Sequence, residues 1–147
     1  MGAKLMSNNV TWNYGFAWDD NLSTQNEEVD YQHKTLFKLV SDVLESNQKG
    51  DSKEKISERL NFLSNYVAEH FEYEEKLMRQ SGFAGYTEHQ EMHKAFIKTA
   101  ISLIDDFHAK GASDDMAEKV DTVVITWLIE HIRAEDIKIA EHIRSLK

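Results

Sequence analysis

The sequence predicts an all-α protein built as an up-down-up-down antiparallel four-helix bundle, and three observations indicate this fold class. The 147 residues contain no proline and only 6 glycines, a composition that suits long helices better than a sheet with many turns. Apolar residues recur at alternating spacings of three and four in four separate segments. Short loops join these segments, so antiparallel neighbours are the simplest arrangement. The length is usual for one domain, and we expect a single domain over residues 1–147.

Residues 1–28 are expected to form a mostly non-helical N-terminal arm. Aromatic residues alternate there with polar ones, at Trp12, Tyr14, Phe16 and Trp18. Asp19, Asp20 and Asn21 then predict a turn. We expect this aromatic arm to pack along the bundle as a cover over the edge of the core, and a part in closing a ligand pocket is the alternative.

The first helix is expected to begin between Ser23 and Asp30 and to run to about Asn47. Its inward stripe consists of Val29, His33, Leu36, Val40 and Val43. Residues 48–51, which include Gly50, form the following loop.

The second helix is expected to start near Ser52, a residue type that caps helix N-termini, and to end before Gly82. Its stripe consists of Ile56, Leu60, Leu63, Val67, His70, Glu74 and Leu77. The third helix is expected to open with a capping box formed by Thr87 and Gln90 and to end before Gly111. Its stripe consists of His89, His93, Phe96, Ala100, Leu103 and Phe107.

The fourth helix is expected to be capped by Ser113. Its stripe consists of Met116, Val120, either Val123 or Val124, Trp127 and His131. We expect a short last helix to follow and to run through Leu146.

Charge and composition exclude several classes of function. With 17 Lys and Arg against 26 Asp and Glu, the net charge is −9, which disfavours binding to nucleic acid or to anionic membrane surfaces. The absence of cysteine excludes disulfides, thiolate metal ligands and cysteine nucleophiles. No segment has the length and apolarity of a signal peptide or of a membrane span, so we expect a cytoplasmic protein.

Polar residues interrupt every apolar stripe, and most of them are good metal ligands. They are His33, His70, Glu74, His89, His93 and His131. In the antiparallel order, the start of the first helix lies level with the end of the second, the start of the third and the end of the fourth, so these residues meet at one end of the bundle. A buried polar group without a partner costs roughly 1–3 kcal/mol, so a cluster of this size requires something that satisfies all its members together. A bound cation does so.

Asp136 is a seventh candidate ligand, with an unusual spacing. It follows His131 by five residues and would lie about 140° around a continuous α-helix from it. We therefore expect a break, a wide turn or a π-type irregularity between the two residues, with Asp136 as a candidate cap for the last helix.

Nitrogen and carboxylate ligands without sulfur suit iron, manganese or zinc, and seven ligands are too many for one ion, so two ions are implied. Two common metal-binding templates are absent from the sequence, the His-Glu-x-x-His of zinc proteases and the Glu-x-x-His of ferritin-like di-iron bundles.

The order of these residues resembles that of the bacterial hemerythrins. The matching motifs are Trp18-Asp19-Asp20, Val29-Asp30-Tyr31-Gln32-His33, His70-x-x-x-Glu74-Glu75, His89-x-x-x-His93 and Trp127-x-x-x-His131-x-x-x-x-Asp136. The resemblance extends from Trp12 to about Leu146. It implies two iron ions joined by an oxo or hydroxo bridge, with one iron held by His89, His93 and His131, the other by His33 and His70, and both by the carboxylates of Glu74 and Asp136.

The same resemblance implies an oxygen-binding protein rather than an enzyme. Dioxygen would bind reversibly at the one open position, on the iron with two histidines, for storage, transport or delivery. An apolar pocket would surround this position, and its candidate walls are Leu36, Phe71, Trp127 and Ile132. The alternatives are an oxygen or redox sensor that acts through a partner protein, and a di-iron oxidase or peroxidase. An unidentified protein that exchanges electrons or receives oxygen is the expected partner.

Two histidines, His108 and His142, fall outside the family pattern. His108 and His142 are expected at the surface, and Glu75 is expected to point away from the cluster. Gln25 stands in a turn where relatives often carry glycine, which leaves the conformation of that turn open.

Overall fold

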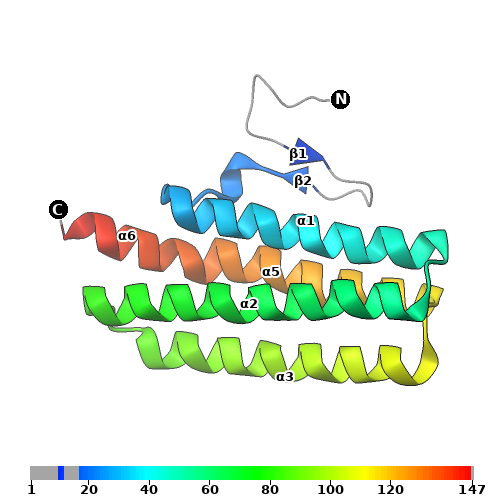
Figure 1. Ribbon diagram of the computed structural model, residues 1–147. Coiled ribbons are helices and arrows are strands. Elements are labelled where there is room, and N and C mark those ends of the chain that lie inside the picture. The colour runs from blue at the N-terminus through cyan, green and yellow to red at the C-terminus, as the bar shows by residue number, and fades with distance from the viewer. Residues whose placement is uncertain (1–9, 12–16, 147) are drawn as a thin grey trace.

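The computed structural model describes residues 10–11 and 17–146, and within them the chain forms an antiparallel four-helix bundle (Figure 1). The first three helices are α1 (Glu27–Lys49), α2 (Lys53–Ser81) and α3 (Tyr86–Lys110), and a fourth helical rod covers residues 114–145. α1 packs against α2, α2 packs against α3, and the rod contacts α1 and α3. The predicted all-α bundle is confirmed.

A short antiparallel strand pair precedes the bundle. β1 (Val10–Thr11) pairs with β2 (Ala17–Trp18), and the turn η1 (Asp20–Leu22) follows, as the run of polar residues predicted. The buried Trp18 ring packs edge-on against Phe37 of α1, with 6.5 Å between ring centroids, so β2 lies against the bundle. The other aromatic residues of the predicted arm, Trp12, Tyr14 and Phe16, lie outside the described residues.

Most of the predicted helix ends are confirmed, and one start signal is wrong. The Ser52 side chain accepts a hydrogen bond from Lys55 N at the start of α2, and Gly82 ends this helix in the left-handed conformation. The expected capping box at Thr87 is absent, because α3 already begins at Tyr86. Its N-cap residue is Gly85, whose carbonyl accepts the bond from His89 N, so the first helical turn forms one residue before Thr87.

The fourth rod alternates between two helix types. It consists of α4 (Asp114–Lys119), the π-helical segment η2 (Val120–Ile125), α5 (Thr126–His131), the π-helical segment η3 (Ile132–Asp136) and α6 (Ile137–Ser145). The predicted irregularity between His131 and Asp136 is therefore confirmed as a π segment. The predicted capping role of Asp136 is wrong, because its side chain makes no cap bond and α6 continues the rod without a break.

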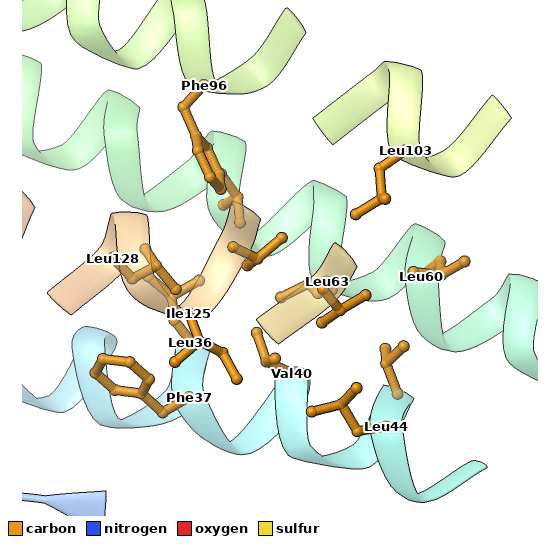
Figure 2. Packing of buried hydrophobic residues seen from close by; sticks show 14 of the residues in the cluster. Leu36, Phe37, Val40, Leu44, Leu60, Leu63, Phe96, Leu103, Ile125 and Leu128 are labelled. Atoms are coloured by element: carbon orange, nitrogen blue, oxygen red, sulfur yellow. The ribbon is translucent and has the colours of Figure 1, made fainter. Parts of the chain in front are cut away.

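Aliphatic and aromatic side chains fill the bundle along most of its length (Figure 2). Leu36 and Val40 of α1 are fully buried and face residues of α2, α5 and η2. Each large apolar side chain removed from water contributes roughly 1.5–3 kcal/mol to stability. The buried imidazoles and carboxylates lie together at one end of the bundle. No helix in the described part of the chain is both long and apolar enough to cross a lipid bilayer.

Candidate metal centre

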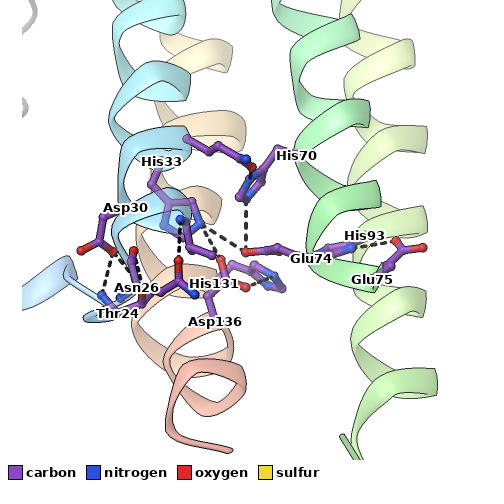
Figure 3. Close-up of polar contacts among 12 residues, drawn as sticks. Thr24, Asn26, Asp30, His33, His70, Glu74, Glu75, His93, His131 and Asp136 are labelled. Atoms are coloured by element: carbon purple, nitrogen blue, oxygen red, sulfur yellow. Dashed lines mark hydrogen bonds and ion pairs between the residues drawn. The ribbon is translucent and has the colours of Figure 1, made fainter. Parts of the chain in front are cut away.

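All seven predicted ligands meet at one end of the bundle. Figure 3 labels each of them except His89. α1 contributes His33, α2 contributes His70 and Glu74, α3 contributes His89 and His93, and the fourth rod contributes His131 and Asp136. Every one of them is buried, with at most 6% of its surface exposed. The four helices thus bring together residues that are up to 103 positions apart in the sequence.

The seven side chains form two groups that share two carboxylates. One group consists of His89, His93, His131, Glu74 and Asp136, and the other consists of His33, His70, Glu74 and Asp136. Within each group, one ligand atom from every residue lies within 4.8 Å of all the others. This is an arrangement for two neighbouring cations with shared carboxylates, because each group offers donors for one ion.

Each shared carboxylate turns one oxygen toward each group. Glu74 Oε2 lies 3.2 Å from His70 Nε2, and Glu74 Oε1 lies 3.2 Å from His93 Nε2. Asp136 Oδ2 lies 2.9 Å from His33 Nε2, and Asp136 Oδ1 lies 3.1 Å from His89 Nε2. Asp136 reaches this position through the π segment η3, because a π turn aligns residues five apart, here His131 and Asp136.

Buried donor atoms without hydrogen-bond partners show that the residues fit a cation. In the described part of the chain these atoms include His33 Nε2, His93 Nε2, both oxygens of Glu74 and Asp136 Oδ1. The Nε2 atoms of His89 and His131 lie only 3.1 Å apart, which two nitrogen lone pairs tolerate only with a proton or a cation between them. A nitrogen and oxygen donor set of this kind suits iron, manganese or zinc.

In the absence of a cation, bound protons supply part of the positive charge that the buried carboxylates need. Burial alone would lower the pKa of His33, but the adjacent carboxylates of Asp136 and Glu74 outweigh it and raise the pKa to about 9. The same balance raises the pKa of His89 to about 9. Burial opposes ionisation of Glu74 and Asp136, yet the neighbouring imidazoles lower the pKa of both carboxyls below the usual range. The cluster therefore retains negative oxygens and requires positive charge beside them.

Two residues outside the predicted set orient two of the histidines. Gln32 Oε1 accepts a hydrogen bond from His70 Nδ1 at 2.7 Å, and Glu75 Oε2 accepts one from His93 Nδ1 at 2.9 Å (Figure 3). The expectation that Glu75 points away from the cluster is wrong. Its carboxylate leaves the α2 face that carries Glu74 but reaches α3, because the two helices are neighbours there. An imidazole that binds a metal needs an acceptor for its second nitrogen, but the spacing of residues in the sequence does not show which side chain supplies it.

Aromatic rings cover one side of the cluster. Phe71 stacks on His93 with 3.8 Å between centroids and 4° between planes, and Trp127 stacks on His131 at 4.3 Å and 11°. Leu36 and Ile132 are almost completely buried, whereas Trp127 is partly exposed. Two of the four predicted pocket walls thus contact imidazoles of the cluster directly.

The two remaining histidines lie outside the cluster. His108 is exposed on α3, as expected. His142 is only half-exposed, and its Nε2 lies 2.7 Å from the carbonyl oxygen of Ser81, so this residue links α6 to the end of α2. The prediction of a surface position is therefore wrong in part for His142.

Comparisons with known proteins agree on one family. The family described as the hemerythrin HHE cation binding domain matches residues 24–143. The bacteriohemerythrin of Pseudomonas paraeruginosa is 28% identical over 129 residues, which cover 87% of this chain and 81% of that protein. A hemerythrin-like protein of Naegleria gruberi is 31% identical over 123 residues, which cover 84% of this chain and 89% of that protein. A crystal structure of wild-type hemerythrin matches the fold with a TM-score of 0.74 at 28% identity, over 86% of this chain and 95% of that chain.

The protein is a four-helix bundle that buries five imidazoles and two carboxylates at one end. This places it in the class of helical-bundle proteins with a metal site made of nitrogen and oxygen donors. Because the family match covers most of the sequence, the chain belongs to the hemerythrin family. Hemerythrins bind oxygen through a non-haem di-iron site and are not enzymes. The resemblance expected from the sequence is confirmed.

Proposed function

We propose that this chain holds a di-iron centre and binds dioxygen reversibly. His89, His93 and His131 would hold one iron, His33 and His70 would hold the other, and Glu74 and Asp136 would bind both. The observation that carries this proposal is the division of the seven ligands into two groups that share both carboxylates. An oxo or hydroxo bridge would complete the pair, and the group with only two histidines would keep one position open.

The pair of iron ions would supply the electrons that reduce dioxygen and recover them on release. The residues of the chain would set the spacing of the two irons and the access of water to them. Glu74 and Asp136 hold the two groups at a constant separation, because each carboxylate faces both. We propose that Leu36, Phe71, Trp127 and Ile132 form the apolar wall that excludes water from the open position, since three of the four are almost completely buried.

We further propose that residues 1–147 form one domain whose role is to store, carry or deliver dioxygen. The four helices share one core, and β2 packs on it through Trp18. The buried apolar residues named above favour reversible binding, because protonation of the reduced oxygen by entering water would turn the carrier into an oxidase.

Metal analysis and optical spectra of one preparation test this proposal. The chain, loaded with ferrous iron without air, should contain two iron ions per chain. Aeration should produce a visible charge-transfer band, and removal of oxygen should abolish it over repeated cycles. A permanent change to the ferric form on first exposure to air, with release of peroxide, would contradict reversible binding and favour the oxidase. One iron per chain would contradict the shared-carboxylate arrangement.

A further inference from the structure

A chain of hydrogen bonds leads from the buried imidazole of His93 to the protein surface. His93 Nδ1 donates to Glu75 Oε2 at 2.9 Å, and Gln90 Nε2 donates to the other carboxylate oxygen, Oε1, at 3.1 Å. The same Gln90 nitrogen lies 3.0 Å from the hydroxyl oxygen of Tyr86, which also accepts from Arg79 Nη1 at 3.2 Å. Both oxygens of Glu75 are therefore engaged, and the carboxylate is held from two sides.

The geometry of the first bond fixes which nitrogen of His93 is free. An ionised carboxylate can only accept, so the proton of the bond belongs to Nδ1. The neutral imidazole then carries its lone pair on Nε2, and this atom faces the cluster, 3.2 Å from Glu74 Oε1. Without Glu75, the alternative tautomer would place a proton where the ligand atom must be.

The two groups of ligands differ in this outer contact. His70, in the group with two histidines, donates from Nδ1 to the neutral amide oxygen of Gln32 at 2.7 Å. The Gln32 amide is oriented in turn by Glu28, whose carboxylate accepts from Gln32 Nε2 at 2.7 Å. His93, in the group with three histidines, faces a full negative charge on a side chain that is only 17% exposed. A charged acceptor makes the stronger hydrogen bond and increases the electron density on the opposite nitrogen.

We propose that Glu75 is a positioning residue of the metal centre. Held by Gln90, whose amide in turn contacts the Tyr86 hydroxyl, it fixes the His93 tautomer that presents Nε2 and makes this imidazole a stronger donor than His70. The inference rests on the ligand set proposed above. It adds that the two cation positions are unequal, with the three-histidine group binding more tightly because of a carboxylate that touches no metal.

Zinc binding tests the inference without any oxygen chemistry. The metal-free chain is titrated with Zn²⁺ against a chromophoric chelator, which resolves the affinities of the two ions. Glu75→Gln keeps an acceptor but removes the charge, and it should weaken one of the two ions about 10- to 100-fold. Glu75→Ala removes the acceptor as well and should weaken the same ion further. Glu72→Gln is the matched control, because it removes an exposed carboxylate from the same helix, and its affinities should stay within about twofold of the unaltered chain.

A spectroscopic readout separates positioning from a general loss of structure. In the zinc-loaded protein, which is diamagnetic, NMR should show a slowly exchanging Nδ1 proton on His93 in the unaltered chain and in Glu75→Gln, and none in Glu75→Ala. In the iron-loaded protein, Glu75→Gln should raise the reduction potential, since a neutral neighbour stabilises the ferric state less. If Glu75→Ala does not fold, Tyr86→Phe removes only the hydroxyl that contacts Gln90, at the outer end of the hydrogen-bond chain. This variant should weaken the binding of the same ion by a smaller factor.

Zinc affinities of Glu75→Gln equal to those of Glu72→Gln would overturn the inference, as would an unchanged Nδ1 proton in Glu75→Ala. These failures are distinct from failure of the proposed function. A chain that binds two zinc ions with the expected inequality but shows no reversible oxygenation would sustain the role of Glu75 and contradict the oxygen carrier. Normal oxygenation in a Glu75→Gln protein with unaltered zinc affinities would sustain the oxygen carrier and contradict the role of Glu75.

Discussion

The Nε2 atom of His89 lies close to ligand atoms of three other residues in its group. Its Nε2 atom lies 3.1 Å from both Asp136 Oδ1 and His131 Nε2, and 3.8 Å from Glu74 Oε1. His89 thus faces both of the other helices that contribute to the three-histidine group, α2 and the fourth rod. At the scale of single residues, it is the best place to test which ligands belong together.

His89→Ala should remove the iron of the three-histidine group. Loss of one imidazole leaves that ion with two nitrogens and shared carboxylates, and the content should fall from two iron ions per chain to one. Iron content is measured after desalting, and circular dichroism checks that the helices remain. His108→Ala, an exposed histidine on the same helix, is the control and should retain both ions. Full retention of both ions in His89→Ala would contradict the assignment.

Residue types and spacings were sufficient to predict the seven clustered side chains but not their supporting residues. Pairs such as His70 with Glu74 share a helix face at a spacing of four, so the pattern is local. The contact of Glu75 with His93 depends on how closely α2 approaches α3, which no local pattern records. Gln32 is equally inconspicuous in the sequence, because exposed and supporting glutamines have the same local spacing.

At the scale of elements, the turn before α1 carries backbone strain. Gln25 has a φ of 65°, the only positive φ at a residue other than glycine in the described chain. Contacts from Asp30 hold the turn, since its carboxylate accepts from Ser23 Oγ at 2.6 Å and from Thr24 N at 2.8 Å. The left-handed conformation explains why glycine suits this position, and it answers the question left open by the sequence.

Gln25→Gly should stabilise the protein. Glycine relieves the left-handed strain of about 1–2 kcal/mol and returns part of it through greater freedom of the unfolded chain, for a net gain of about 0.5–1 kcal/mol. A chain of this length should show a rise in Tm of about 2–4 °C per kcal/mol by calorimetry. Gln25→Ala retains the Cβ atom and serves as the control. An equal rise in Gln25→Ala would locate the effect in the exposed side chain and refute the backbone argument.

The π segment η3 is the element on which Asp136 depends. Insertion of one alanine after the exposed Ala134, with the exposed Lys138 deleted to keep the rest of α6 in register, should turn Asp136 about 100° away from the cluster. We expect a helical protein by circular dichroism that no longer retains stoichiometric iron. Ala134→Ser, which keeps the length, is the control. Normal iron content in the lengthened segment would show that the spacing set by η3 is dispensable.

The sequence predicted η3 but not η2. The five-residue spacing between His131 and Asp136 required an irregularity, because both residues were already candidate ligands. The segment η2 contains Val120 and Val124, which are buried in the core at a spacing of four that an ordinary α-helix also permits. A π segment without a functional residue at an odd spacing therefore leaves no trace in the pattern. The helix start at Tyr86 was missed for a related reason, since a backbone turn at Gly85 replaced the expected side-chain cap.

At the scale of the whole molecule, buried charged groups are concentrated at one end of the bundle, and the rest of the interior is apolar. The core shared by the helices is apolar, whereas the cluster end holds two ionised carboxylates among five imidazoles. Periodicity predicted this division, because each stripe changes from apolar to polar on the same side of the bundle. The strand pair of β1 and β2 could not be predicted, since two-residue strands are too short to show alternation.

The polar end makes the stability of the molecule depend on pH in opposite ways with and without metal. In the metal-free protein, the raised pKa of about 9 at His33 and His89 gives a stabilisation that is complete below about pH 6.5 and is lost as the pH rises through 9. The lowered pKa values of Glu74 and Asp136 give a stabilisation that is present above about pH 4 and is lost as the pH falls. The metal-free protein should therefore be most stable between about pH 4.5 and 6.5.

Iron should shift this optimum upward. Ligand imidazoles must be deprotonated, so protons compete with the metal at low pH, and the competition fades toward pH 9. The rise in Tm from metal-free to ferrous protein, measured by anaerobic calorimetry, should be larger at about pH 8.5 than at about pH 5.5. His89→Ala should show a smaller rise and a weaker dependence on pH, because one of the two titrating imidazoles is gone. A rise in Tm that stays constant or shrinks with increasing pH would mean that the buried protons and the metal do not occupy the same atoms.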